Sequence, residues 1–172
     1  MGSPDRLFVD YSARKLRQLC GRIEDCLGRL TDEQIWARGA ESENAVGNLV
    51  LHLTGNVRQW IVSGVGGQPD VRQRDAEFAA RGGIAADTLA EHLRGIVAAA
   101  AAVIEMLAPE RLGQRLLVQG YDVTVLEAIY AVVEHFSGHT GQIVYATKLF
   151  TGEDLGYYRY LSASAPHAEQ TP

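Results

Sequence analysis

The sequence has little cysteine, and its two cysteines are poorly placed for a disulfide. Cys20 and Cys26 lie six positions apart in a segment with helical spacing. A helix would separate their Cα atoms by roughly 9 Å, which exceeds the ~7 Å that a disulfide can span. The spacing also lacks the CxxC pattern of redox and zinc motifs. We therefore expect two free thiols that pack as small hydrophobic side chains.

Long apolar runs and clusters of positive charge are also missing. The most apolar run, residues 96–107, is too short to span a bilayer and contains Glu105. No apolar segment follows a basic N-terminus, so no secretory signal is visible. The formal net charge of the 172 residues is −5, and Lys and Arg form no stripe that would neutralise phosphates. These absences predict a cytoplasmic protein that binds neither a membrane nor nucleic acid.

What the sequence does have is helical patterning. Hydrophobic residues make up 47% of the chain and charged residues 22%, which is typical of one globular domain. Ser3 followed by Pro4 is a favoured helix start, and the apolar residues from Leu16 to Leu30 keep a three-four spacing. Thr31 with Gln34 three residues later is a capping-box pattern for a short helical turn.

Three further long helices are predicted, at about residues 44–63, 87–107 and 124–150. The first of these ends at a glycine-rich GVGG, and the last begins with another capping box, Thr124 with Glu127. The pattern predicts an all-α four-helix bundle with a long crossover between helices two and three. We expect a single domain over residues 1–161 and a flexible tail over residues 162–172, which has almost no apolar content.

Two connections are unusual. Residues 115–123 hold β-formers around Gly120, so they form either an extended connection or a small hairpin. Residues 68–83 form a charged connection that is long for a compact domain. Such a segment is either a solvated crossover or one that carries function or a short helix of its own. Arg74 and Asp75 within it would then cover a site or bind substrate, or else make surface ion pairs.

Two histidines lie four positions apart in the last predicted helix, in the stretch EHFSGHTGQI. Residues i and i+4 share a helix face, so His135 and His139 can reach one metal ion, as in half of the zincin motif. Glu134 lies about 100° away from His135 around the axis, which makes it a poor direct ligand. Gln142 lies on the histidine side and can orient a ligand or a water.

A third histidine, His52, lies at the edge of the apolar arc of the second long helix. It is in line with three other polar side chains, Asn48, Asn56 and Gln59. Such a row indicates either a polar cavity inside the bundle or a strip on its surface. If the cavity exists, His52 faces the histidine pair. For His92 and His167 we expect no functional role.

Glycine is concentrated beside the histidine pair. Gly138 and Gly141 each lower helix propensity by roughly 1 kcal/mol relative to alanine. Their presence indicates that room is needed there, either for a bound molecule or for close packing of a neighbouring helix. The two explanations are not separable from the sequence.

Three stretches of the sequence resemble the DinB-like family of bacterial four-helix proteins, also called the YfiT-type putative metal-dependent enzymes. They are ENAVGNLVLHLTGNVRQWIVSGVGG, RDAEF and HFSGHTGQIVY. The resemblance implies a divalent metal, zinc or nickel, held by His52, His135 and His139. It also implies a homodimer and an enzyme of the thiol S-transferase type that uses a low-molecular-weight thiol. Leu51 and Val62 hint at the dimer surface.

Three classes of function follow for a small-molecule substrate. Three imidazoles leave at least one position open on zinc, where a thiol or a water is activated. The first class is therefore a metal-dependent transferase acting on small electrophiles, and a metal-dependent hydrolase is its near variant. Glu134 and Tyr130 are the candidates for a general base. The second class is a non-catalytic module that binds metal or a small molecule, and the third is a metal-free core in which the histidines only pack.

Overall fold

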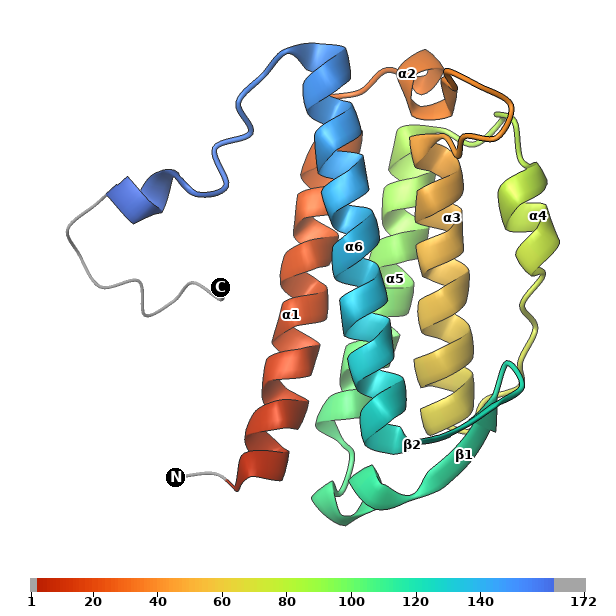
Figure 1. Cartoon of the computed structure of the whole chain (residues 1–172), viewed down its shortest axis with the longest axis vertical. Helices are drawn as coiled ribbons and strands as arrows, with labels where there is room; N and C mark the ends of the chain where they lie inside the picture. Colours follow the sequence, from red (N-terminus) through yellow and green to blue (C-terminus); the bar gives the residue numbers. More distant parts are fainter. Residues whose placement is uncertain (1–2, 163–172) are drawn as a thin grey trace.

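The computed structural model describes residues 3–162 and shows an all-α bundle of four long helices (Figure 1). The long helices are α1 (Pro4–Leu27), α3 (Val46–Val57), α5 (Ala86–Glu105) and α6 (Val125–Thr151). The fold class predicted from the sequence is confirmed. Helix α3 continues without a break into η1 (Arg58–Val65), whose hydrogen bonds are of the π type. None of the described helices is both long and apolar enough to cross a membrane.

The helix ends are set by local side chains, as the sequence predicted. The Ser3 hydroxyl accepts a hydrogen bond from the backbone of Arg6 at the start of α1. Thr124 and Glu127 form a complete capping box at the start of α6. Gly152 ends that helix with φ +69°, a left-handed conformation that glycine adopts without steric cost. These caps satisfy backbone groups that a helix end otherwise leaves without partners.

The second long helix begins later and ends later than the predicted residues 44–63. It begins at Val46 because the Asn48 side chain reaches back to accept a hydrogen bond from the backbone N–H of Ala45, 3.1 Å away. It runs on to Val65, where the switch to π-type bonds adds a wider turn. The left-handed residue that follows is Gly67, with φ +75°. The π segment is of interest because such distortions are frequent at functional sites.

The core lies between the four long helices. Helix α1 packs against α5 and α6, while α3 packs against α5 and α6 on the other side. Leu16, Ile23 and Leu27 of α1 are fully buried. Cys20 and Cys26 are free and buried, as expected, and burial raises the pKa of the Cys20 thiol to about 12. Val62, which we took for a dimer-surface residue, is buried, and Leu51 packs against the core. The hint was therefore wrong for Val62, whereas Leu51 is partly exposed.

Smaller elements close the two ends of the bundle. Helix α2 (Asp32–Trp36) has the predicted capping box, with Thr31 and Gln34 bonding reciprocally. The strands β1 (Arg115–Val118) and β2 (Tyr121–Thr124) form an antiparallel hairpin, with Val118 opposite Tyr121. Short 3₁₀ turns, η2 (Pro109–Gly113) and η3 (Arg159–Ser162), follow α5 and α6. The predicted tail lies outside the described residues, except for its first residue, Ser162.

The crossover between α3 and α5 is not merely a solvated loop. Part of it folds into a short helix, α4 (Arg74–Ala79), which lies alongside α3 (Figure 1). The Asn48 amide donates to the backbone carbonyls of Glu77 and Ala80, at 2.9 and 3.0 Å, and so ties the crossover to α3. The segment therefore lies against the helix that carries His52.

Candidate metal centre

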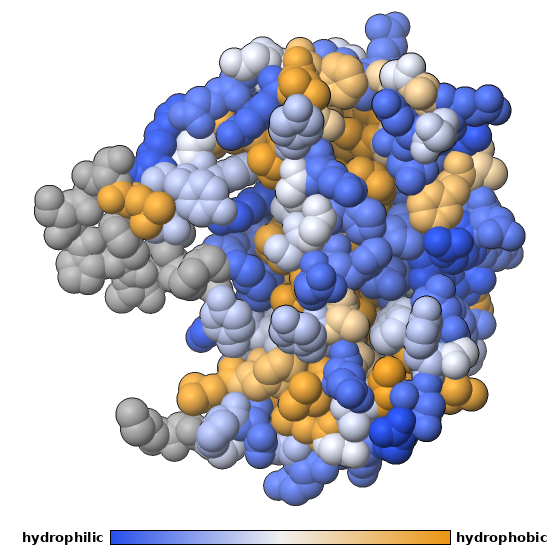
Figure 2. Space-filling model, viewed as in Figure 1, coloured by the Kyte–Doolittle hydropathy of each residue, from blue (hydrophilic) through white to orange (hydrophobic). Residues whose placement is uncertain are grey.

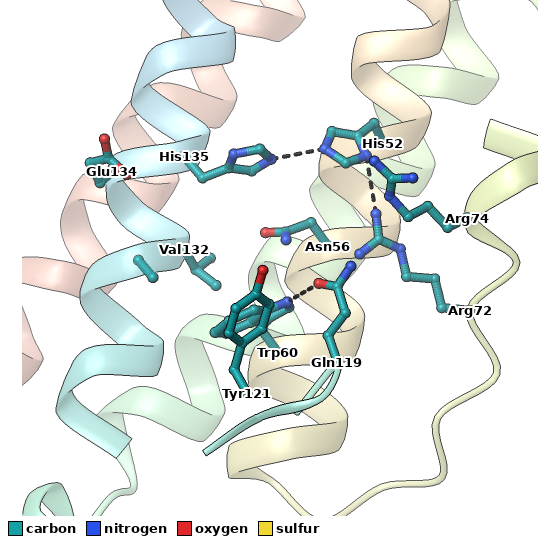
Figure 3. Close-up of a pocket in the computed structure, with 11 residues that line it drawn as sticks. His52, Asn56, Trp60, Arg72, Arg74, Gln119, Tyr121, Val132, Glu134 and His135 are labelled. Atoms are coloured by element: carbon teal, nitrogen blue, oxygen red, sulfur yellow. Dashed lines mark hydrogen bonds between the residues drawn. The ribbon is translucent and has the colours of Figure 1, made fainter. Parts of the chain in front are cut away.

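Three histidines from two helices converge between α3 and α6. One ring nitrogen of each of His52, His135 and His139 lies within 4.8 Å of the corresponding nitrogens of the other two. The Nε2 atoms of His52 and His135 are 2.9 Å apart (Figure 3). This separation fits either a shared proton or a common ion, because tetrahedral zinc places its nitrogen ligands roughly 3.3 Å apart. Among the histidine, cysteine and carboxylate side chains of the described residues, these three histidines form the group whose spacing could hold a metal ion.

The helices place these rings by simple periodicity. His135 and His139 lie one turn apart on α6, with ring centroids 4.5 Å apart and planes nearly perpendicular. His52 lies across from both, its ring centroid 5.0 Å from that of His135 and 5.2 Å from that of His139. His52 is buried, whereas the other two rings are half-buried. The cluster is thus open on the side of α6.

The environment keeps the α6 imidazoles neutral. Burial, together with the nearby His139, His52 and Arg72, lowers the pKa of His135 to about 4. Burial also lowers the pKa of His139; the nearby His52 adds to this effect, and the hydrogen bond that His139 donates to Gln142 opposes it. A neutral imidazole is the form that binds a metal ion. These two rings are therefore ready to bind a cation at neutral pH without first losing a proton.

Glu77 of α4 fixes the orientation of the His52 ring. Its Oε2 lies 3.1 Å from His52 Nδ1, and both side chains are about nine-tenths buried. Arg72 Nη2 lies 3.0 Å from the same Nδ1 atom, so His52 Nδ1 contacts both members of the Arg72–Glu77 pair. A carboxylate only accepts, so the His52 tautomer that bonds to Glu77 carries its proton on Nδ1. That tautomer leaves Nε2 free for a metal, which is the carboxylate–histidine arrangement found behind many metal ligands.

Arg72 completes this buried network. Its guanidinium makes two parallel hydrogen bonds to the Glu77 carboxylate, each 2.8 Å long, and its third nitrogen donates to Gln59 Oε1 at 2.9 Å. Burial raises the pKa of Glu77, but the hydrogen bonds from Arg72 and His52 outweigh it and the net pKa is below its ordinary value. Glu77 is therefore ionised at neutral pH, and the charge of Arg72 is matched by it.

Glycine at position 55 makes room for this network. A Cβ atom built on Gly55 would lie 2.0 Å from Glu77 Oε1 and 3.0 Å from Arg72 Nε. No side chain fits there unless the carboxylate moves. Glycine in a helix interior lowers the stability of the helix by about 1 kcal/mol relative to alanine. Glycine is needed at position 55 because the crossover approaches the helix closely there.

Gln142 acts on His139 as Glu77 acts on His52. Gln142 Oε1 lies 2.7 Å from His139 Nδ1, so the amide oxygen accepts from an Nδ1–H and leaves Nε2 unprotonated. The sequence suggested this orienting role for Gln142, and the structure places the two groups in contact. Two of the three rings thus have a polar neighbour at Nδ1 that holds the ring in place.

Three members of the polar row, Asn48, His52 and Asn56 of α3, are buried, and the fourth, Gln59 of η1, is partly buried. Asn48 is fully buried but binds the crossover and Arg38, so it supports the fold and lies away from the cavity beside the histidines. Gln59 binds Arg72 and Asp70. Asn56 is 9% exposed, and its Oδ1 has no hydrogen-bond partner in the described structure. A buried acceptor without a partner costs about 1–3 kcal/mol.

The two general-base candidates lie elsewhere. Tyr130 is 62% exposed on α6 and lines no part of the cavity beside the histidines. Glu134 is exposed at the rim of that cavity, and its side chain lies on the flank of α6 away from His52 (Figure 3). Neither lies against the histidine rings. Arg74 does line the cavity, whereas Asp75 is exposed beside it.

The sequence reasoning missed Glu77 and Arg72. Both lie in the charged connection and look there like surface residues. The useful signal was Gly55, an isolated glycine inside a helical pattern, which indicates close approach of another segment. Gly138 and Gly141, in contrast, are exposed, and a Cβ at either would contact nothing within 4 Å. Close packing within the chain does not explain them.

The remaining histidines are remote from the cluster. His92 is exposed on α5, and His167 lies outside the described residues.

Comparison with known proteins identifies a family and a fold. Residues 4–165 match a protein-family model, that of the family described as "Protein of unknown function (DUF1572)". A conserved protein from Enterococcus faecalis has a similar structure, with a TM-score of 0.71 and 17% identity, over 83% of this chain and 96% of that one. A DinB-like protein from Bacillus cereus gives a TM-score of 0.62 and 17% identity, over 77% and 85%. None of the curated proteins matches. The chain therefore belongs to the DUF1572 family, and its fold is that of a DinB-like protein.

Proposed function

We propose that this protein is a metal-dependent enzyme of the thiol S-transferase type, with a divalent ion held by His52, His135 and His139. The observation that carries the proposal is the convergence of three imidazole nitrogens from two helices, two of them oriented by Glu77 and Gln142. Nitrogen donors of this kind suit zinc and nickel, of which we favour zinc. Three protein ligands also leave a position open, which is typical of catalytic rather than structural zinc.

The chemistry follows from that open position. A bound divalent ion lowers the pKa of a thiol or a water beside it, so that the deprotonated form is available at neutral pH. In the transferase, the sulfur of a low-molecular-weight thiol forms a bond to an electrophilic carbon. The leaving group departs with its electron pair, and the thiol proton goes to solvent. Glu77 keeps the His52 ring in place during this step, because Arg72 holds the carboxylate on its other side.

Two separate cavities each include part of the histidine cluster in their lining, which favours a reaction between two organic molecules. One, of about 340 Å³, is lined by His52 and His135 together with polar and aromatic side chains. The other, of about 430 Å³, is lined by His139 and by apolar residues that include Leu49 and Phe150. A hydrolase requires space for one organic substrate and water. Separate spaces of different polarity suit a transferase better, and hydrolysis is the alternative.

The first test is metal content. Protein prepared without an affinity-column metal should contain about one zinc or nickel ion per chain by elemental analysis. His52→Ala, His135→Ala and His139→Ala should each lower this content, whereas the exposed control His92→Ala should not. Protein that has no metal and does not take up added zinc would refute the proposal.

The second test separates enzyme from binding module. The loaded protein is incubated with a thiol and a panel of small electrophiles, and loss of free thiol is followed. Turnover that needs both the metal and the thiol supports a transferase, whereas turnover without thiol indicates the hydrolase. Metal binding with no turnover of any panel member would leave the non-catalytic module as the function.

We also propose that the chain forms a homodimer through α6. Apolar side chains are exposed near both ends of this helix, and in the view of Figure 2 hydrophobic surface gathers near both ends of the bundle. Four of them are symmetric about the midpoint between Ser137 and Gly138: Leu126, Tyr130, Tyr145 and Leu149. An antiparallel pair of α6 helices related by a two-fold axis there would place Tyr130 opposite Tyr145. The exposed glycines at the middle would allow close approach of the two backbones.

The dimer is tested by sedimentation equilibrium. Tyr145→Glu should shift the protein towards monomer, whereas Met106→Glu, at a more exposed position on another helix end, should not. Equal association of the two variants would exclude the α6 interface.

A further inference from the structure

The cavity of about 340 Å³ beside the histidines has features that the metal site does not explain. It lies between α3, α6, the crossover and the tip of the β1–β2 hairpin (Figure 3). His52 and His135 form one end, and the aromatic residues Trp60 and Tyr121 form the other. Its walls thus combine a reactive end with a surface suited to the carbon skeleton of a ligand.

Asn56 is the first unexplained feature. It lies one helical turn after His52, lines the cavity, and is 9% exposed. Its Oδ1 is buried without any hydrogen-bond partner in the described structure. Nearly all buried polar atoms in native proteins are paired, so an orphan at a cavity wall indicates a partner that belongs to a ligand. A carbonyl oxygen accepts, so that ligand has to bring an O–H or N–H group.

Arg74 is the second feature. Its guanidinium lies 4.9 Å from the ring of Phe78, and that ring lies 4.8 Å from His52, so the charge is held near the histidines. No carboxylate within the described residues forms an ion pair with Arg74, in contrast to Arg72, whose charge Glu77 neutralises. Glu134, at the rim, lies on the other flank of α6 (Figure 3). The cavity therefore has an unmatched positive charge, which suits an anion.

The hairpin tip is the third feature. The two-residue turn between Val118 and Tyr121 places Gln119 at φ +52°, a left-handed conformation unusual for a residue with a side chain. Gln119 Oε1 accepts from Trp60 Nε1 at 3.0 Å, which fixes the Trp60 ring as a wall of the cavity. A two-residue hairpin turn of this kind requires positive φ at both central residues, and this turn holds Gln119 where its side chain meets Trp60.

We propose that this cavity binds a small 2-hydroxy carboxylate, or a larger molecule that ends in this group. The Arg74 guanidinium donates to the carboxylate, the Asn56 carbonyl oxygen accepts from the hydroxyl, and the carbon skeleton lies against Trp60. This assignment deepens the proposed function, on which it rests for the reaction that follows. Binding itself depends only on Asn56, Arg74 and the aromatic wall, so it is testable without metal.

The experiment uses the full chain stripped of metal and follows Trp60 fluorescence during titration with three probes. Lactate has both the carboxylate and the hydroxyl, propionate lacks the hydroxyl, and lactamide lacks the charge. Lactate should bind at least about tenfold more tightly than either of the others. Trp60→Phe should abolish the response, since Trp36 lies elsewhere and donates to the carbonyl of Ile84.

Variants locate the two contacts. Arg74→Gln should weaken lactate binding by about tenfold or more, and Asn56→Ala should bring lactate down to the affinity of propionate. The matched control is Arg14→Gln, because Arg14 is likewise exposed and stacked on an aromatic ring, 5.8 Å from the centroid of Tyr11. It should leave binding unchanged.

Each contrary result overturns the proposal. Equal affinity for lactate and lactamide removes the role of charge, and equal affinity for lactate and propionate removes the role of the hydroxyl. No response to any probe up to about 50 mM overturns it as a whole. Zinc uptake without lactate binding refutes this inference alone, whereas lactate binding by a protein that never takes up zinc refutes the proposed metal function alone.

Discussion

Gly55→Ala is predicted to weaken the metal site while leaving all three histidines in the sequence. The new Cβ would lie 2.0 Å from Glu77 Oε1, and ordinary contact begins at 3.4 Å, so the carboxylate has to move by about 1.4 Å. After such a movement Glu77 cannot keep both its 3.1 Å contact to His52 and its 2.8 Å contacts to Arg72. Loss of a carboxylate behind a histidine ligand typically lowers metal affinity 10–100-fold, or about 1.4–2.8 kcal/mol.

The assay is competition for zinc against a chromogenic indicator at neutral pH, together with urea unfolding of the metal-free protein. Gly95→Ala is the matched control, because it is also an exchange inside a long helix but its Cβ would contact nothing within 4 Å. This control should gain about 1 kcal/mol of stability and keep its zinc affinity. If Gly55→Ala binds zinc as tightly as the parent, the reasoning that Glu77 supports the site through His52 is wrong.

Three further predictions concern single side chains. Glu77→Gln keeps the size of the side chain but leaves Arg72 buried and unmatched, so the free energy of unfolding should fall by about 3 kcal/mol in urea titrations; an unchanged value would contradict the buried pair. His135 is neutral in the folded state down to a pKa of about 4, against 6.5 in the unfolded chain. As the pH falls from 6.5 towards 4 the unfolded chain takes up a proton that the folded one does not, so the metal-free protein loses stability in this window. The His135→Asn variant should lose less unfolding free energy between pH 7 and pH 5 in the same titrations. An equal loss would refute the lowered pKa of His135. Finally, Cys20 is buried with its pKa raised to about 12, so a thiol reagent at pH 8 should label it only after unfolding, and rapid labelling of the native protein would contradict its burial.

Local features of this fold were readable from the sequence. The caps at Ser3, Thr31 and Thr124 were predicted because each depends on residues within three positions of one another. The pairing of His135 with His139 follows from helical periodicity alone. The same periodicity argues against Tyr130 as a site residue. It lies five residues before His135, which places it roughly 140° away from His135 around the helix axis.

The parts that were not predicted depend on the path of the crossover. Glu77 and His52 are 25 positions apart, and no local pattern brings them together. A buried Arg–Glu pair looks, in one sequence, the same as a solvated pair in a charged loop. The resemblance to a known family supplied the three histidines as a set, but the residues that orient them became visible only with the chain folded.

The crossover and the histidines are thermodynamically linked through Glu77. Whatever binds His52 Nε2 strengthens the hydrogen bond at Nδ1, and with it the docking of α4 on α3. By reciprocity, conditions that detach α4 must lower the affinity of the site for its ion. We therefore expect chelators to make residues 68–83 more sensitive to proteases, so that a cleavage pattern reports on occupancy without any knowledge of the substrate.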